Sequence, residues 1–174
     1  AESAVSYGVE MDVRKSLDGL GSSLTDNFSV LVNASYIHSA IELGNSSVEV
    51  NQNRALQGQS PYIVNLGLFY EHPTTGFNAS AQYNVYGKRI FSAGDGQDSY
   101  NYYEMPRNLL DMSLGYTINE QWRVKAGVSN LLNAEYRLME DSNSDTELSN
   151  AAVDKPILKY RQGQEVTVGA SYTF

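Results

Sequence analysis

Seven stretches of the chain alternate between apolar and polar residues with a period of two, and this alternation limits the possible folds more than any other feature. Successive side chains of a β-strand point to opposite faces, so each stretch predicts a strand with one dry face and one polar face. The dry faces carry neither a charge nor a side-chain amide. The stretches are residues 5–14, 28–36, 62–70, 77–85, 110–117, 122–129 and 165–174.

The linkers between these stretches alternate in length. Residues 17–27, 72–76 and 119–121 form the shorter set, and residues 39–60, 87–107 and 134–164 form the longer, polar set. When consecutive strands are antiparallel, alternate linkers lie at opposite ends of the sheet. We therefore expect all short turns at one rim and all long loops at the other.

Composition supports an all-β chain and excludes several classes of function. The 174 residues include 13 Tyr, 5 Phe and no Cys, which excludes disulfides, Cys-ligated metals and a thiol nucleophile. A formal charge of −8 without a Lys/Arg cluster argues against nucleic acid as a partner. The sequence has no run of about 18 apolar residues, so it predicts no membrane-spanning helix.

A sheet with one dry face fits either a soluble β-sandwich or an outer-membrane barrel whose dry face meets lipid. Segregated loop lengths, a small and mostly uncharged polar face, and strands long enough to cross an apolar band favour the barrel. Aromatic residues also gather on the dry face beside the short turns, as at a bilayer interface: Phe28, Tyr70, Phe77, Tyr116, Trp122 and Phe174. We predict antiparallel transmembrane β-barrel strands that contact the lipid bilayer.

Seven strands are too few and of the wrong parity for a closed single-chain bacterial barrel, which has an even count. Unpaired backbone groups at two sheet edges in lipid would each cost several kcal/mol. The inward face is rich in Gly and Ser, which fill little volume and indicate a wide barrel. We expect residues 1–174 to be the C-terminal part of a larger barrel, with the earlier strands upstream or on another chain.

Five segments resemble the closing third of TonB-dependent outer-membrane receptors, especially those of Bacteroidetes-like bacteria. The Asn-Leu-Leu-Asn-x-x-Tyr element and the terminal Phe are the more specific of the shared features. The segments are residues 54–65, 83–90, 103–108, 127–136 and 171–174.

The resemblance implies a 22-stranded barrel around an N-terminal plug, which the TonB protein pulls with proton-motive energy to import a scarce siderophore or nutrient. This chain would supply the last seven strands, without the plug domain and the TonB box. The ending Tyr172-Thr173-Phe174 is similar to the signal that the barrel-assembly machinery reads, and an aromatic anchor at the rim is an alternative role. We predict no cofactor.

Two further groups of residues are candidates for contacts. A polar, aromatic outer loop is a candidate for stacking on substrate and hydrogen bonding to it, with solvation as the alternative: Asp95, Asp98, Tyr100, Tyr102 and Tyr103. Charged residues of the polar face toward the short-turn rim are expected to meet the plug or water, never lipid: Glu10, Asp12, Arg14, Asp111, Arg123 and Lys125.

Catalysis is not expected. His38 and His72 lie near opposite rims and are predicted to be surface or interface residues, and neither a phosphate-binding loop nor a zinc motif is present. An acidic segment offers oxygen ligands of the kind that calcium prefers, but we do not expect it to have the D-x-[DN] spacing of a calcium loop. Acidic loops are usually solvated, and we predict no metal there. This segment contains Glu140, Asp141, Asp145, Glu147 and Asp154.

Two rival functions remain open from the sequence. One is a soluble β-sandwich adhesin or carbohydrate-binding module, and the other is a plugless porin or secretion barrel.

Overall fold

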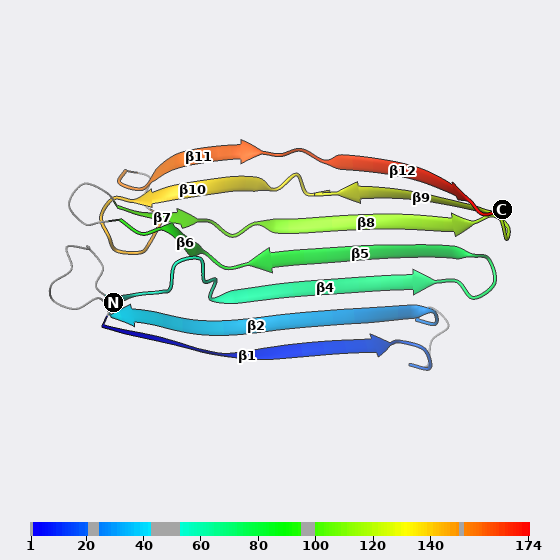
Figure 1. The fold of residues 1–174 in the computed structure, drawn as a ribbon, viewed down its shortest axis with the longest axis horizontal. Helices are drawn as coiled ribbons and strands as arrows, with labels where there is room; N and C mark the ends of the chain where they lie inside the picture. The colour runs from blue at the N-terminus through cyan, green and yellow to red at the C-terminus, as the bar shows by residue number, and fades with distance from the viewer. Residues whose placement is uncertain (1, 21–24, 43–52, 95–99, 150–151) are drawn as a thin grey trace.

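The computed structural model describes residues 2–20, 25–42, 53–94, 100–149 and 152–174 as twelve β-strands in two antiparallel sheets (Figure 1). None of the described residues forms a helix that could cross a membrane. The strands are β1 Ser3–Ser16, β2 Phe28–Glu42, β3 Asn53–Arg54, β4 Tyr62–Glu71, β5 Phe77–Tyr86, β6 Arg89–Ser92, β7 Asn101–Glu104, β8 Asn108–Thr117, β9 Trp122–Ser129, β10 Glu135–Asp141, β11 Lys155–Arg161 and β12 Glu165–Tyr172.

The main sheet confirms the predicted all-β, antiparallel fold. Its strands have the order β1-β2-β4-β5-β8-β9-β12, with the short β3 paired to the end of β2. Each of the seven alternating stretches supplies one long strand, and every long strand pairs with its neighbours in the chain. Among the described residues no strand pairs with the outer edges of β1 and β12, so the sheet is not closed into a barrel.

The second sheet was not predicted from the sequence. It has the order β11-β10-β7-β6. Each of these strands is next in the chain to one long strand, and those long strands have the matching order β12-β9-β8-β5 in the main sheet. In Figure 1 the four short strands continue the long ones beyond the long-loop end of the main sheet. The two sheets are therefore one wall, and we call the outer part the outer sheet.

Four short interruptions separate the outer sheet from the main sheet. Three of them contain residues that do not continue a β-ladder, since Pro106 lacks an N–H donor and Asn130, Asn133 and Gly163 have positive φ angles of 53°, 47° and 92°. We call this level the seam. It consists of residues 87–88, 105–107, 130–134 and 162–164.

The buried side chains lie in and around the outer sheet. Ile90, Tyr103 and Leu138 are the buried hydrophobic residues of the described chain. In the main sheet, by contrast, extensive contacts join hydrogen-bonded neighbours, and none of the described segments forms a second layer over either face. A sheet-on-sheet core, which the soluble sandwich requires, is absent from the described residues.

Candidate membrane belt, lumen face and outer cluster

Strand register places all seven dry faces on one side of the main sheet. Val30 pairs with Leu68, Leu68 with Ala81, and Ala81 with Met112. Across the remaining strands Val168 pairs with Ala126. A single slip by one residue would have turned a strand's apolar set to the other face, so the common register confirms that the dry faces form one surface.

This surface remains uncovered. Val168 is 82% exposed, and on the more central strands Leu66 is 42% and Leu114 50% exposed. A contiguous apolar face of this size is far beyond what a soluble monomer usually exposes. This arrangement is expected in a transmembrane barrel, where every second side chain of a strand contacts lipid.

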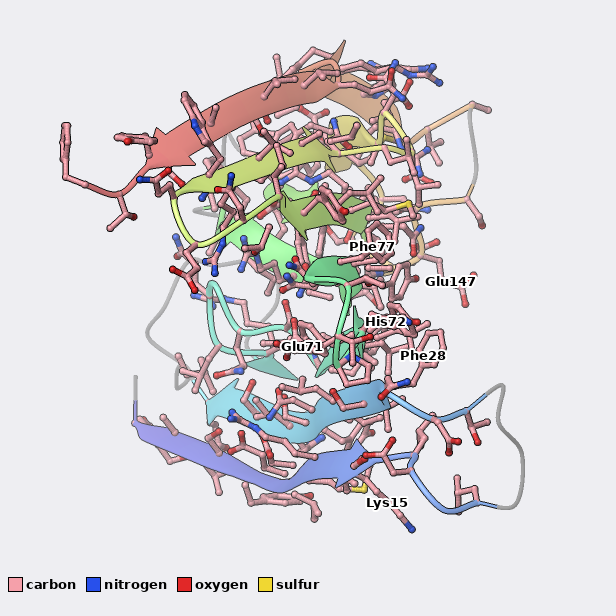
Figure 2. The ribbon with its side chains drawn as sticks, turned by 90° about the vertical axis from the view of Figure 1, so that its right-hand side faces the viewer. Lys15, Phe28, Glu71, His72, Phe77 and Glu147 are labelled. Carbon is pink, nitrogen blue, oxygen red and sulfur yellow. The ribbon has the colours of Figure 1, made fainter. Side chains whose placement is uncertain are left out.

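Aromatic rings border the surface at the short-turn end. Phe28 and Tyr70 have ring centroids 4.8 Å apart, and Tyr70 and Phe77 6.0 Å apart. Figure 2, which looks onto this end, shows Phe28, His72 and Phe77 gathered on one side of the sheet. On the last strands the Trp122 and Tyr172 rings contact each other, with centroids 5.0 Å apart and a tilt of 53°. The predicted aromatic rim is confirmed.

A second aromatic row lies toward the long-loop end of the same face and was not recognised in the sequence. Tyr36 pairs directly with Tyr62, and Tyr7 contacts His38 with ring centroids 5.0 Å apart. Eight residues separate Phe28 from Tyr36 and Tyr62 from Tyr70, which is roughly 26 Å along a strand and about 20 Å after a tilt of some 40°. The two rows therefore bracket a band close to the thickness of a bilayer's apolar zone, which we call the membrane belt.

The opposite, polar face carries a ladder of side-chain amides across three strands, which ends at a carboxylate on a fourth. Asn84 donates to Asn65 over 2.6 Å, Asn65 donates to Asn33 over 3.1 Å, and Asn33 donates to Glu10 over 3.3 Å. Ser80 and Ser113 continue the polar surface with hydroxyl oxygens 2.8 Å apart. In a barrel this face lines the lumen, where paired amides suit a watery surface.

The charged lumen candidates occupy two levels. Arg14 approaches Asp12 at 3.7 Å in the later half of β1, and Arg123 donates to the Thr117 hydroxyl over 3.2 Å, both toward the short turns as predicted. Lys125 lies opposite Gly169 in the same region. Glu10 is near the middle of β1 and accepts from the amide ladder.

Asp111 corrects the prediction, because it lies toward the long-loop end. It is the fourth residue of β8, which begins at the seam, and it accepts a hydrogen bond of 2.8 Å from the backbone N–H of Asn130. The alternation in the sequence assigns Asp111 to the polar face but does not give its distance from either rim. That distance depends on the direction in which β8 runs.

The seam is joined by the Asn130 side chain of the Asn-Leu-Leu-Asn element and by the Gln164 side chain. Asn130 donates to the Gly163 carbonyl over 2.6 Å and accepts from the Ala134 N–H over 2.9 Å. Gln164 donates to the Leu131 carbonyl over 2.6 Å. These bonds replace the missing ladder bonds between β9 and β12, which gives this element a structural role.

Beyond the seam, an ion pair is buried in the outer sheet. Arg89 binds Glu104 with N–O distances of 2.7 Å from Nε and from Nη2, and Tyr86 donates to the same carboxylate over 2.6 Å. The Glu104 side chain is 7% exposed. Because the carboxylate is almost fully hydrogen-bonded, the pair fixes the position of β6 against β7.

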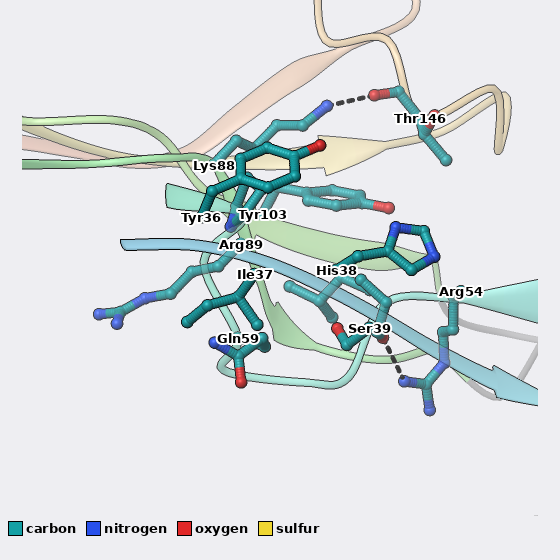
Figure 3. Close-up of a pocket in the computed structure, with 13 residues that line it drawn as sticks. Tyr36, Ile37, His38, Ser39, Arg54, Gln59, Lys88, Arg89, Tyr103 and Thr146 are labelled. Atoms are coloured by element: carbon teal, nitrogen blue, oxygen red, sulfur yellow. Dashed lines mark hydrogen bonds between the residues drawn. The ribbon is translucent and has the colours of Figure 1, made fainter. Parts of the chain in front are cut away.

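A pocket of about 340 Å³ opens between the end of β2 and the outer sheet (Figure 3). Lys88 extends across it, binds the Thr146 carbonyl and lies 4.9 Å from the centre of the Tyr103 ring. None of the described residues that line it carries a carboxylate, in contrast with the acidic chain as a whole. It consists of Tyr36, Ile37, His38, Ser39, Arg54, Ala55, Gln59, Pro61, Lys88, Arg89, Ile90, Tyr103 and Thr146.

The predicted substrate-facing loop is only partly a loop. Asp95 and Asp98 lie outside the described residues. Tyr102 and Tyr103 belong to β7, and Tyr103 is 5% exposed, which removes its ring from any surface that could stack on substrate. Tyr100 is 42% exposed, so its ring is still able to stack on a substrate.

The acidic segment is predicted to be solvated, but the structure buries part of it. Asp141 is 0% and Asp154 2% exposed, while Asp145 and Glu147 are exposed. Burial raises the pKa of the Asp141 carboxyl, and the charges of Asp145 and Asp154 raise it further, against the lowering effect of nearby backbone N–H groups. Within the described residues, no three acidic or histidine side chains form a metal site as they stand.

The two histidines occupy the rims as predicted. His72 accepts hydrogen bonds from the Thr74 and Thr75 N–H groups at 3.3 and 3.2 Å, and so stabilises the turn between β4 and β5. His38 lies in the outer part of β2 against Tyr7. Both contacts are structural.

One antiparallel wall with an uncovered apolar belt on one face and a polar lumen face on the other defines a β-barrel segment. Residues 1–131 match the family model described as TonB dependent receptor-like, beta-barrel, and the chain belongs to this family. No curated protein and no solved structure matches the chain. The family is one of outer-membrane receptors, which confirms the predicted class in general terms.

Proposed function

We propose that this chain is the C-terminal barrel portion of a TonB-dependent receptor that imports a scarce substrate across the outer membrane. The observation that carries the proposal is the membrane belt, an apolar surface shared by seven strands that no described part of the chain covers. A receptor wall requires this arrangement, because lipid covers the belt and a watery lumen meets the other face. A siderophore or other nutrient is the proposed cargo, and bacteria of the Bacteroidetes type are the proposed source.

The proposal assigns a direction to the sheet. The short turns would face the periplasm, and the seam, the pocket and the outer sheet would face the exterior. The uncovered edges of β1 and β12 would pair with the remaining strands, up to about 22 in all. The exposed Tyr100 beyond the seam would be available to substrate.

The partners follow from the same orientation. A plug domain seated in the lower lumen would meet Asp12, Arg14, Arg123 and Lys125, and Glu10 just above them. Exposed ion pairs contribute about 0–1 kcal/mol each, so these residues would position the plug without clamping it. TonB would act through the plug, outside residues 1–174.

The last aromatic residues have a proposed role in assembly. Tyr172 ends β12, and its ring lies 5.3 Å from that of Phe174, centre to centre, at the short-turn rim. Phe174 is fully exposed. Tyr172 and Phe174 would present the barrel-assembly signal and afterwards anchor the rim at the bilayer interface.

The whole receptor tests the proposal. The gene should encode a plug domain and a TonB box upstream of these residues, and cells should need both TonB and that box to grow on one of a panel of scarce iron chelates, cobalamin, glycans or peptides. In planar bilayers, the plugged receptor should show no steady ion conductance. Steady conductance together with TonB-independent uptake would instead identify a porin and defeat the proposal.

A further inference from the structure

The turn that follows β10 contains oxygen-bearing side chains at alternate positions. Its sequence is Asp141-Ser-Asn143-Ser-Asp145-Thr146-Glu147, which is the D-x-[DN]-x-[DN] spacing of a calcium loop. In such loops the sixth residue is a Gly that makes a sharp turn. Here the sixth residue is Thr146, which adopts a positive φ of 64°.

A buried, unsatisfied oxygen gives independent evidence for a ligand. Asp141 is 0% exposed, and its Oδ2 accepts a hydrogen bond of 3.0 Å from the Thr146 N–H. Its Oδ1 is buried without a hydrogen-bond partner in the described part of the chain. Burying a carboxylate oxygen without a partner is costly, and a cation is the partner that removes the cost.

The surroundings of Asp141 are acidic. Asp145 and Asp154 are the charges that raise its pKa, and Asp154 is itself 2% exposed. Lys88 lies beside the loop, where its ammonium group binds the Thr146 carbonyl and the face of Tyr103.

We propose that residues 141–147, together with Asp154, bind one Ca²⁺ ion. The ligands would be a carboxylate oxygen of Asp141, the side-chain oxygens of Asn143 and Asp145, and the main-chain carbonyl of Glu147, with Asp154 and water completing six to eight oxygens. Three carboxylates and neutral oxygens suit calcium. Zinc prefers nitrogen and sulfur ligands, and magnesium requires a smaller and more regular octahedron.

Binding requires a small rearrangement of the loop. In this structure Asp145 accepts hydrogen bonds of 2.7 Å from the Asn143 side-chain amide and from the Glu147 N–H. The Asn143 amide would turn its oxygen inward, and one Asp145 oxygen would follow. Both side chains are exposed, so little packing opposes the movement.

The site would fix one wall of the pocket. The Thr146 carbonyl is the acceptor that holds Lys88 across the opening, so a bound ion that orders the loop also orders this contact. Calcium would thereby join the β10–β11 hairpin to the segment between β5 and β6.

The test uses the whole receptor in detergent micelles after treatment with a chelator, titrated with CaCl₂ and separately with MgCl₂ by calorimetry. Asp141→Asn and Asp145→Asn are the test variants. Asp26→Asn, an exposed acid in the turn at the opposite end of the sheet, is the matched control. We expect the wild type and the control to bind one more Ca²⁺ per receptor than either test variant, with no matching difference for Mg²⁺.

Cleavage after Glu147 by a glutamate-specific protease gives a local measurement. With calcium at ten times its Kd, cleavage should slow about tenfold in the wild type and the control, and should not change in the two test variants. Equal stoichiometry in all four proteins, or cleavage that ignores calcium, would overturn the site. Since Asp145 is exposed, Asp145→Asn keeps the assay decisive if Asp141→Asn fails to assemble.

Discussion

The side-chain amide of Asn130 donates a hydrogen bond of 2.6 Å to the Gly163 carbonyl, across 33 positions of sequence. The same side chain accepts from the Ala134 N–H, and the Asn130 N–H donates to Asp111. One residue therefore connects β8, β9 and the segment before β12 at the level where the ladder is interrupted.

Replacing Asn130 by Ala should destabilise the barrel. The change leaves the Gly163 carbonyl and the Ala134 N–H without their partners, at a cost of about 1–3 kcal/mol. Urea unfolding of the receptor in lipid vesicles measures this loss. Leu132→Ala is the control, because Leu132 lies in the same turn and is 51% exposed. Equal stability of the two variants would show that the seam does not depend on Asn130.

The role of Asn130 illustrates what the sequence could and could not predict. A period of two is a local signal, and it gave the strands, the common apolar face and the aromatic rim. The bond between Asn130 and Gly163 joins distant residues, and no local pattern announces it. The family resemblance singled out the segment, and the structure supplied its physical reason.

The outer sheet could not be predicted from the sequence for a related reason. Strands β6 and β7 have four residues each, too few to show an alternation. Their buried positions are also partly polar, as the Arg89–Glu104 pair shows. The prediction that the acidic segment lacks the spacing of a calcium loop is wrong, because Asp141, Asn143 and Asp145 have that spacing. The burial of Asp141 is what distinguishes this loop from an ordinary acidic loop.

Gly87 should not tolerate a methyl group. A Cβ at this position would lie 2.8 Å from Cγ of Pro61 and 2.8 Å from the Tyr62 ring, and the proline ring cannot move aside. We expect Gly87→Ala to cost about 1–3 kcal/mol through overpacking. The unfolding free energy in vesicles checks this. Gly169→Ala is the control, because its Cβ would make only ordinary contacts with Lys125 at 3.7 Å, and a control that lost as much would refute the steric argument.

Stability of the outer sheet should depend on the ionisation of Asp141. Burial raises the pKa of this carboxyl above its ordinary value of 3.8. The folded form therefore holds the proton more tightly than the unfolded form, and stability is lost as the pH rises from 3.8 through the folded pKa. Without calcium, the protection factors of β10 amides against hydrogen exchange should fall over this range.

The variant Asp141→Asn should remove this pH dependence and raise the protection factors of β10 at pH 7 in calcium-free buffer. Asp26→Asn should change neither quantity. If Asp141→Asn lowers protection at pH 7 instead, the ionised carboxylate has a stabilising partner and the argument from burial fails.

Arginine substitutions at neighbouring positions of β12 should separate the two faces of the sheet. Val168 belongs to the membrane belt, four residues from the rim residue Tyr172, whereas Thr167 faces the lumen opposite Gly127. Val168→Arg near the middle of the apolar band should cost about 2–4 kcal/mol, and Thr167→Arg less than about 1 kcal/mol, because only the first transfers a charge into hydrocarbon. Reversible unfolding of the receptor in lipid vesicles measures both. If Thr167→Arg were the more damaging change, lipid would cover the polar face and the orientation of the whole wall would be reversed.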